Sequence, residues 1–139
     1  MSENDGQKIL ILEDEAMIRT LMARMLRGKG FDVLESGTGE DAIGRFEDAI
    51  ADNDPFDLAI LDLTLPGNLD GRQVLEKCLE MQPSLKAIIA SGYADEEITA
   101  SFDAFPTVKL LCKPYHMADL LGMVQQQLDG APPEETTNA

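Results

Sequence analysis

Tryptophan is absent from this chain, and aromatic residues of all kinds make up only 5% of its 139 residues. Basic residues are scarce too, because 11 Lys and Arg stand against 26 Asp and Glu and leave a formal net charge of −15. A surface of that sign repels the phosphate backbone of DNA and RNA. We therefore expect no direct nucleic-acid binding.

Long apolar runs are also missing. No stretch approaches the roughly 18 apolar residues that span a bilayer, and residues 1–8 contain no signal-peptide core. The two cysteines, Cys78 and Cys112, fall in a predicted helix and a predicted strand and lack the spacing of metal ligands. We predict a cytoplasmic protein without membrane insertion, in which both thiols are reduced and buried.

The remaining composition is typical of a folded domain. Apolar residues make up 44% of the chain and charged residues 27%, and the length suits one hydrophobic core. The last eleven residues hold two prolines, two glutamates and little that can be buried. We therefore assign residues 1–128 to one domain and residues 129–139 to a disordered tail.

Short apolar runs alternate along the chain with stripes of helical period. Runs at 8–12, 57–61, 85–90 and 108–112 are typical of strands buried on both faces of a parallel sheet, and a further strand is expected at about 31–35. The first helical stripe, which we expect to face the core, is Met17, Ile18, Leu21, Met22, Met25 and Leu26. Thr38 and Asp41 give a weak capping signal for the second helix.

This alternation predicts the fold class. Five strands separated by helices indicate an α/β protein with a five-stranded parallel sheet, helices on both faces and a doubly wound (βα)5 order. In such sheets the ligand site lies beyond the carboxyl ends of the strands. Side chains at those ends are the candidates for function.

Charged and hydroxyl side chains follow four of the predicted strands. Glu13 and Asp14 come after the first strand, Asp62 ends the third, Ser91 the fourth, and Lys113 follows the fifth. Three neighbouring carboxylates raise one another's pKa values unless a cation lies among them, and oxygen ligands favour Mg²⁺. The charges of three carboxylates, Mg²⁺ and Lys113 cancel, which predicts a site for phosphoryl transfer.

With these motifs the chain resembles the receiver domains of two-component response regulators, the CheY-like family. The resemblance covers about residues 8–128. The matching segments are 9–15 (ILILEDE), 61–66 (LDLTLP), 70–71 (DG), 90–92 (ASG) and 112–115 (CKPY). It implies the flavodoxin-like or CheY-like form of the doubly wound fold.

The resemblance also implies the chemistry of the site. Asp62 would be the phosphoacceptor and would take its phosphoryl group from a sensor histidine kinase or a histidine phosphotransfer protein. Lys113 and Ser91 would contact that group. Glu13, Asp14, Asp62 and the backbone carbonyl of Thr64 would bind Mg²⁺.

A protein of this kind is a signalling domain rather than an enzyme, because it catalyses only its own phosphorylation and dephosphorylation. As a single-domain response regulator it would act on an unknown protein target, as a monomer or weak dimer. The side chains of Thr64 and Tyr93 would help to set the lifetime of the phosphoryl group. Leu110 departs from the family pattern, which usually has an aromatic residue there, and the loop at Gly67 is one residue longer than the commonest spacing.

Two other functions remain open from the residues alone. A phosphorylation-independent pseudo-receiver would keep the fold as a scaffold, although such proteins usually lack one of the site residues that are intact here. A phosphatase of the haloacid dehalogenase type would also use an aspartate, Mg²⁺ and a lysine. The motif of these phosphatases, however, lies at the first strand, whereas Asp62 lies on the third.

His116, the only histidine, is expected to be structural or exposed.

Overall fold

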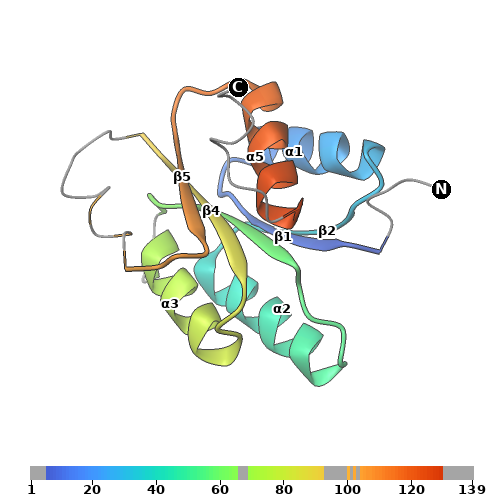
Figure 1. Ribbon diagram of the computed structural model, residues 1–139, viewed down its shortest axis with the longest axis vertical. Coiled ribbons are helices and arrows are strands. Elements are labelled where there is room, and N and C mark those ends of the chain that lie inside the picture. Colours follow the sequence, from blue (N-terminus) through green and yellow to red (C-terminus); the bar gives the residue numbers. More distant parts are fainter. Residues whose placement is uncertain (1–5, 66–68, 93–99, 101, 103, 130–139) are drawn as a thin grey trace.

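The computed structural model describes residues 6–65, 69–92, 100, 102 and 104–129. Its parallel strands form one sheet in the order β2-β1-β3-β4-β5 (Figure 1). They are β1 (Lys8–Leu12), β2 (Asp32–Ser36), β3 (Leu58–Asp62), β4 (Lys86–Ser91) and β5 (Val108–Cys112). The predicted strands are confirmed, with the second, third and fourth displaced by one residue toward the C-terminus.

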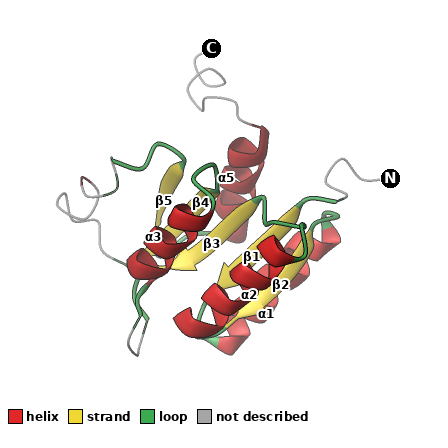
Figure 2. Ribbon diagram, turned by 90° about the horizontal axis from the view of Figure 1, so that it is seen from below, coloured by secondary structure: helices red, strands yellow, loops and turns green. Residues whose placement is uncertain are grey.

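Helices cover both faces of the sheet, as predicted. Within the described residues they are α1 (Ala16–Gly28), α2 (Gly39–Ala51), α3 (Gly71–Met81) and α5 (Met117–Asp129). Helices α1 and α5 pack on one face and α2 and α3 on the other (Figures 1 and 2). No helix in this part of the chain is long and apolar enough to cross a membrane.

The alternation of side chains along each strand divides the core into two layers. On β1, Leu10 and Leu12 pack toward α2 and α3, whereas Ile9 and Ile11 pack toward α1 and α5. All four are at most 1% exposed, because a parallel sheet covered on both faces buries successive residues. This two-sided burial explains why the strands read as continuous apolar runs.

Two helix starts are defined by side-chain caps. Thr38 accepts a hydrogen bond from the backbone N–H of Asp41 at 3.1 Å, which confirms the predicted cap of α2. Asp70 and Gln73 form a reciprocal capping box at α3. At the other end of the domain α5 includes Asp129, one residue beyond the predicted domain end.

The predicted burial of α1 is wrong at two positions. Met17 is 86% exposed and Leu21 51% exposed. The apolar stripe is two columns wide, and only the column that includes Met22 and Leu26 faces the sheet directly. Met17 and Leu21 lie on the outer column and point toward solvent.

One of the two cysteines was also predicted wrongly. Cys78 lies on the buried side of α3, and burial raises the pKa of its thiol to about 12. Cys112 is exposed, because β5 is an edge strand and successive side chains point to opposite faces. Its neighbour Leu111 occupies the buried side.

Candidate functional site

Three carboxylates meet at the carboxyl edge of the sheet. Glu13 and Asp14 follow β1, and Asp62 ends β3, which pairs directly with β1. One oxygen from each of the three carboxylates lies within 4.8 Å of the others. Glu13 is 2% exposed and Asp62 4% exposed, whereas Asp14 faces solvent. The predicted acidic cluster is therefore assembled by the fold.

Backbone amides orient the two buried carboxylates. The N–H of Glu15 donates to Glu13 Oε2 at 3.0 Å, and the N–H of Thr64 donates to Asp62 Oδ1 at 3.1 Å. In each case the donor stands two residues after the acid. These bonds partly compensate the loss of solvation that burial imposes on a charged group.

Lys113 supplies the positive charge of the site. Its Nζ lies 3.2 Å from Asp62 Oδ2, and its backbone N–H donates to Ser91 O at 2.7 Å. Ser91, at the end of β4, is 3% exposed. The five predicted side chains of Glu13, Asp14, Asp62, Ser91 and Lys113 thus share one edge of the sheet. The Lys113–Pro114 peptide bond is cis.

The electrostatics of the site reflect burial together with an excess of negative charge. Burial raises the pKa of Glu13, and repulsion from Asp62 raises it further. Burial lowers the pKa of Lys113, but attraction to Asp62 outweighs this effect, so the net shift is upward. Burial and the nearby Glu13 likewise raise the pKa of Tyr115. Among the described residues Lys113 is the one cation in an ion pair with the cluster, which is left two negative charges in excess.

Two residues that support the site were not predicted. A side chain at Gly71 would collide with the backbone of Asp62 and Leu63, so α3 can begin beside the end of β3 only with glycine. Arg19 on α1 donates from Nη1 to the backbone carbonyl of Glu13 at 2.8 Å. The Asp70-Gly71 pair is a sequence signal for the first residue, but no pattern singles out Arg19, whose contact depends on the rotation of α1.

The structure also places three further residues that were singled out from the sequence. Thr64 is exposed, and Leu110 is partly buried against the core on the α2 and α3 side. His116 is exposed, and its backbone N–H donates to Asp119 Oδ2 at 3.2 Å at the start of α5. Tyr93 and the loop at Gly67 lie outside the described residues.

Fold and site together define a class of protein: a doubly wound α/β domain with a buried aspartate, two further acids and a lysine at the carboxyl edge of its sheet. The chain belongs to the response regulator receiver domain family, whose model matches residues 9–125. The resemblance stated from the motifs is therefore confirmed.

Known relatives agree with this assignment. The chain is 28% identical to the response regulator receiver protein CpdR of Brucella abortus over 90% of its own length and 99% of that protein. It is similar to the solved receiver domain of the hybrid histidine kinase CckA, with 33% identity, a TM-score of 0.72, and 87% and 98% of the two chains covered. A CheY-like receiver domain protein of Methanospirillum hungatei gives 30% identity, a TM-score of 0.77, and 89% and 94% coverage. The chain spans only 12% of the full sensor kinase CckA of Brucella abortus.

Proposed function

We propose that this chain is a response regulator that accepts a phosphoryl group on Asp62 and signals through contact with other proteins. The observation that carries the proposal is the ion pair of 3.2 Å between the buried Asp62 and Lys113, inside a cluster of three carboxylates. The match to CpdR, which covers 99% of that relative, supports a single-domain regulator.

The chemistry would be an in-line transfer from a phosphohistidine. A carboxylate oxygen of Asp62 attacks the phosphorus, a P–O bond forms, and the P–N bond breaks with its electrons left on the imidazole, which takes up a proton. Lys113 neutralises charge on the transferring oxygens, and the Ser91 hydroxyl donates a hydrogen bond to one of them. Later hydrolysis of the acyl phosphate resets the domain.

The donor set fits a hard divalent cation. Three carboxylates and one lysine leave two negative charges in excess. The pKa of Glu13 is raised by burial first and by repulsion from Asp62 second. We propose that Glu13, Asp14, Asp62 and the Thr64 carbonyl bind Mg²⁺, which prefers oxygen ligands. When bound, the ion supplies positive charge against the oxygens of the phosphoryl group.

The phosphoryl donor would dock on the start of α1. This helix begins two residues after Asp14 and exposes Met17 and Leu21, which with Arg24 line a shallow hollow. Exposed apolar side chains beside a reactive site are typical of a protein contact. A histidine kinase or a histidine phosphotransfer protein placed there would bring its phosphohistidine toward Asp62.

The output would pass from the phosphoryl group into β4 and β5. Ser91 and Lys113 end or follow these strands and are joined by a backbone hydrogen bond of 2.7 Å. A phosphoryl group that contacts both side chains would therefore bias the surface of β5 and α5 toward the state that binds a target.

The proposal is tested by phosphorylation with acetyl phosphate or phosphoramidate, followed by intact mass, for wild type and Asp62→Asn. We expect an addition of about 80 Da that requires Mg²⁺, is lost in EDTA and is absent from the variant. Asp57→Asn, a change of the same kind at the opposite edge of the sheet, is the matched control and should be phosphorylated normally.

Other outcomes distinguish the alternatives. A wild-type chain that folds and binds Mg²⁺ but stays unmodified would support a phosphorylation-independent scaffold. Continuous release of phosphate from a free phosphate ester would support a phosphatase of the haloacid dehalogenase type.

A further inference from the structure

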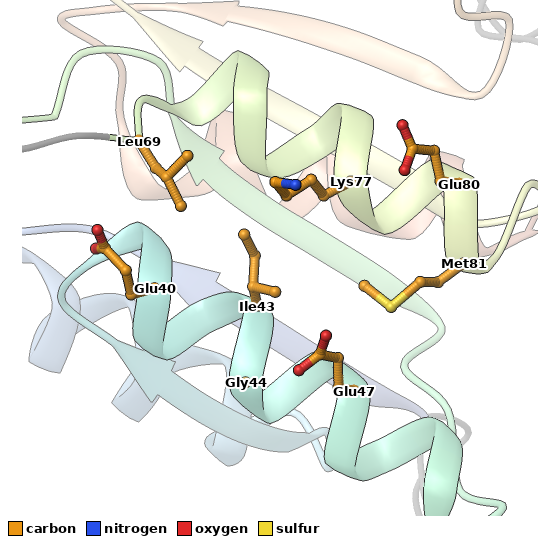
Figure 3. Close-up of a pocket in the computed structure, with 8 residues that line it drawn as sticks. All are labelled: Glu40, Ile43, Gly44, Glu47, Leu69, Lys77, Glu80 and Met81. Carbon is orange, nitrogen blue, oxygen red and sulfur yellow. The ribbon is translucent and has the colours of Figure 1, made fainter.

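Helices α2 and α3 leave a groove between them on the face of the domain opposite α1 and α5. Its volume is 410 Å³ (Figure 3). Ile43 of α2, Met81 of α3 and Leu69, which precedes α3, project into the space between the two helices. Met81 is 36% exposed, and Ile43 and Leu69 are only partly buried. The groove is therefore an accessible apolar strip.

Acidic side chains surround this strip. Glu40 and Glu47 on α2 and Glu80 on α3 line the groove, with Lys77 as the one basic residue among its lining (Figure 3). Within the described part of the chain no ion pair joins any of the three glutamates to a cation. The rim thus presents unneutralised negative charge on a chain that already has a net charge of −15.

Gly44 gives the groove an open side on α2. A glycine inside a helix costs about 0.5–1 kcal/mol relative to alanine, so a helix-interior glycine usually has a packing reason. Here a Cβ atom at position 44 would meet nothing within 4 Å. Packing within the domain does not require this glycine, but a bulky side chain at position 44 would occupy the groove that Gly44 lines.

We propose that this groove between α2 and α3 is a docking site for a basic, amphipathic helix of another protein. Apolar side chains of such a helix would fill the strip along Ile43, Leu69 and Met81, and its Lys or Arg residues would face the glutamates of the rim. An amphipathic helix laid into an apolar groove between two helices is a recurrent mode of peptide recognition.

Charge selects this occupant over parts of the chain itself. A second copy would bring another net charge of −15 against an acidic rim. The C-terminal residues 130–139 contain two glutamates and no basic residue, so they lack the complementary charge as well. A basic partner gains both electrostatic attraction and apolar contact.

The test is a titration of the full chain with a model peptide of about 18 residues, long enough to form a helix. The peptide has leucine on one face and lysine on the other. A scrambled peptide of the same composition and a peptide with glutamate in place of lysine are the controls. Two-dimensional ¹H–¹⁵N NMR locates the site, and the shifts give the Kd. We expect the largest shifts at Ile43, Gly44, Lys77 and Met81, and weaker binding of both control peptides.

Paired variants separate groove binding from general attraction to an acidic protein. Gly44→Leu places a bulky side chain in the groove and should weaken peptide binding about tenfold or more, an effect as large as the loss of a central contact. Gly44→Ala leaves the groove open and should bind like wild type. Glu40→Lys with Glu47→Lys should weaken binding more than Asp32→Lys with Asp129→Lys, which changes the net charge equally at exposed sites outside α2 and α3. Thermal unfolding confirms that each variant is folded.

The proposal would be overturned by equal affinity for the scrambled peptide, by shifts centred away from the groove, or by unchanged binding of folded Gly44→Leu. Concentration-dependent broadening of the groove signals without peptide would instead assign the groove to self-association and would also overturn it. The inference does not depend on phosphorylation. Asp62→Asn should bind the peptide like wild type, so a failure of the proposed phosphoacceptor function leaves this test intact.

Discussion

Two lysine–aspartate pairs lie at opposite edges of the same sheet, and they are built in opposite ways. At the amino edge Lys8 is 9% exposed, and its Nζ lies 3.1 Å from Asp54, whose side chain is 69% exposed. At the carboxyl edge the aspartate is the buried partner: the side chain of Asp62 is 5% exposed and that of Lys113 30% exposed.

The groups that surround the two lysines also differ. Lys8 Nζ also donates to the backbone carbonyl of Asp54 at 2.9 Å and lies 4.8 Å from the ring centroid of Phe56. Two hydrogen bonds and a ring contact, all from groups of the domain, therefore stabilise this buried cation. Lys113, in contrast, faces a cluster in which carboxylates outnumber it three to one. At the amino edge one lysine pairs with one aspartate, whereas the cluster at the carboxyl edge keeps two negative charges in excess.

The sharpest test of this contrast is the loss of Lys113. In Lys113→Met the rate of phosphorylation by acetyl phosphate should fall about a hundredfold, as when one charge-stabilising donor is removed from an active site. Folding should persist, because the lysine is partly exposed and methionine keeps the apolar part of its side chain. Intact mass against time gives the rate. Phosphorylation of Lys113→Met at the wild-type rate would contradict a role for this pair in the transfer.

The effect of Mg²⁺ on stability should also distinguish the two edges. At a Mg²⁺ concentration of 100 times Kd, binding to the native state alone adds about 2.7 kcal/mol to the free energy of unfolding. Urea unfolding of wild type should show this gain, and Asp14→Asn, which removes an exposed acid of the cluster, should lose most of it. Asp54→Asn at the amino edge is the control and should keep the whole gain. An equal gain in all three proteins would place the ion elsewhere.

A substitution at the amino edge should change the stability of the domain and leave the phosphorylation rate unchanged. Lys8→Met should lower the free energy of unfolding by about 1–3 kcal/mol, because it removes charged hydrogen bonds to Asp54 and the contact with Phe56. Its phosphorylation rate, measured as for Lys113→Met, should equal that of wild type. A Lys8→Met variant that is phosphorylated more slowly than wild type but unfolds with the same free energy would mean that the two edges are coupled.

The contrast also shows which parts of the structure could be predicted. The positions of Asp62, Ser91 and Lys113 at one edge could be predicted because a buried parallel strand is a continuous apolar run, so its polar end marks the edge at which a ligand site is expected. The Thr38 cap was found because it depends on neighbours in sequence. The exposure of Met17 depends on how α1 is rotated about its axis, which the helical period leaves open.

Contacts between distant segments could not be predicted either, because they too depend on how the elements are placed in the fold. Lys8 is the polar first residue of the apolar run 8–12, and its partner Asp54 is 46 residues away. The hydrogen bond from Arg19 to the Glu13 carbonyl and the groove beside Gly44 likewise arise from the relative placement of packed elements. Local period and capping chemistry predict elements and their ends, whereas these contacts need the assembled fold.

The smallest expected effect concerns the exposed acid of the structural pair. Asp54→Asn should cost only about 0.2–1 kcal/mol, because an ion pair with one exposed partner is weakened by solvent. A double-mutant cycle with Lys8→Met isolates this coupling, and 1 M NaCl, where the screening length is about 3 Å, should reduce it further. Urea unfolding of the four proteins at both salt concentrations gives the coupling energy. A coupling of several kcal/mol that persists at high salt would show that burial of Lys8 alone makes a pair strong, and the distinction between the two edges would then rest on the excess of carboxylates around Asp62.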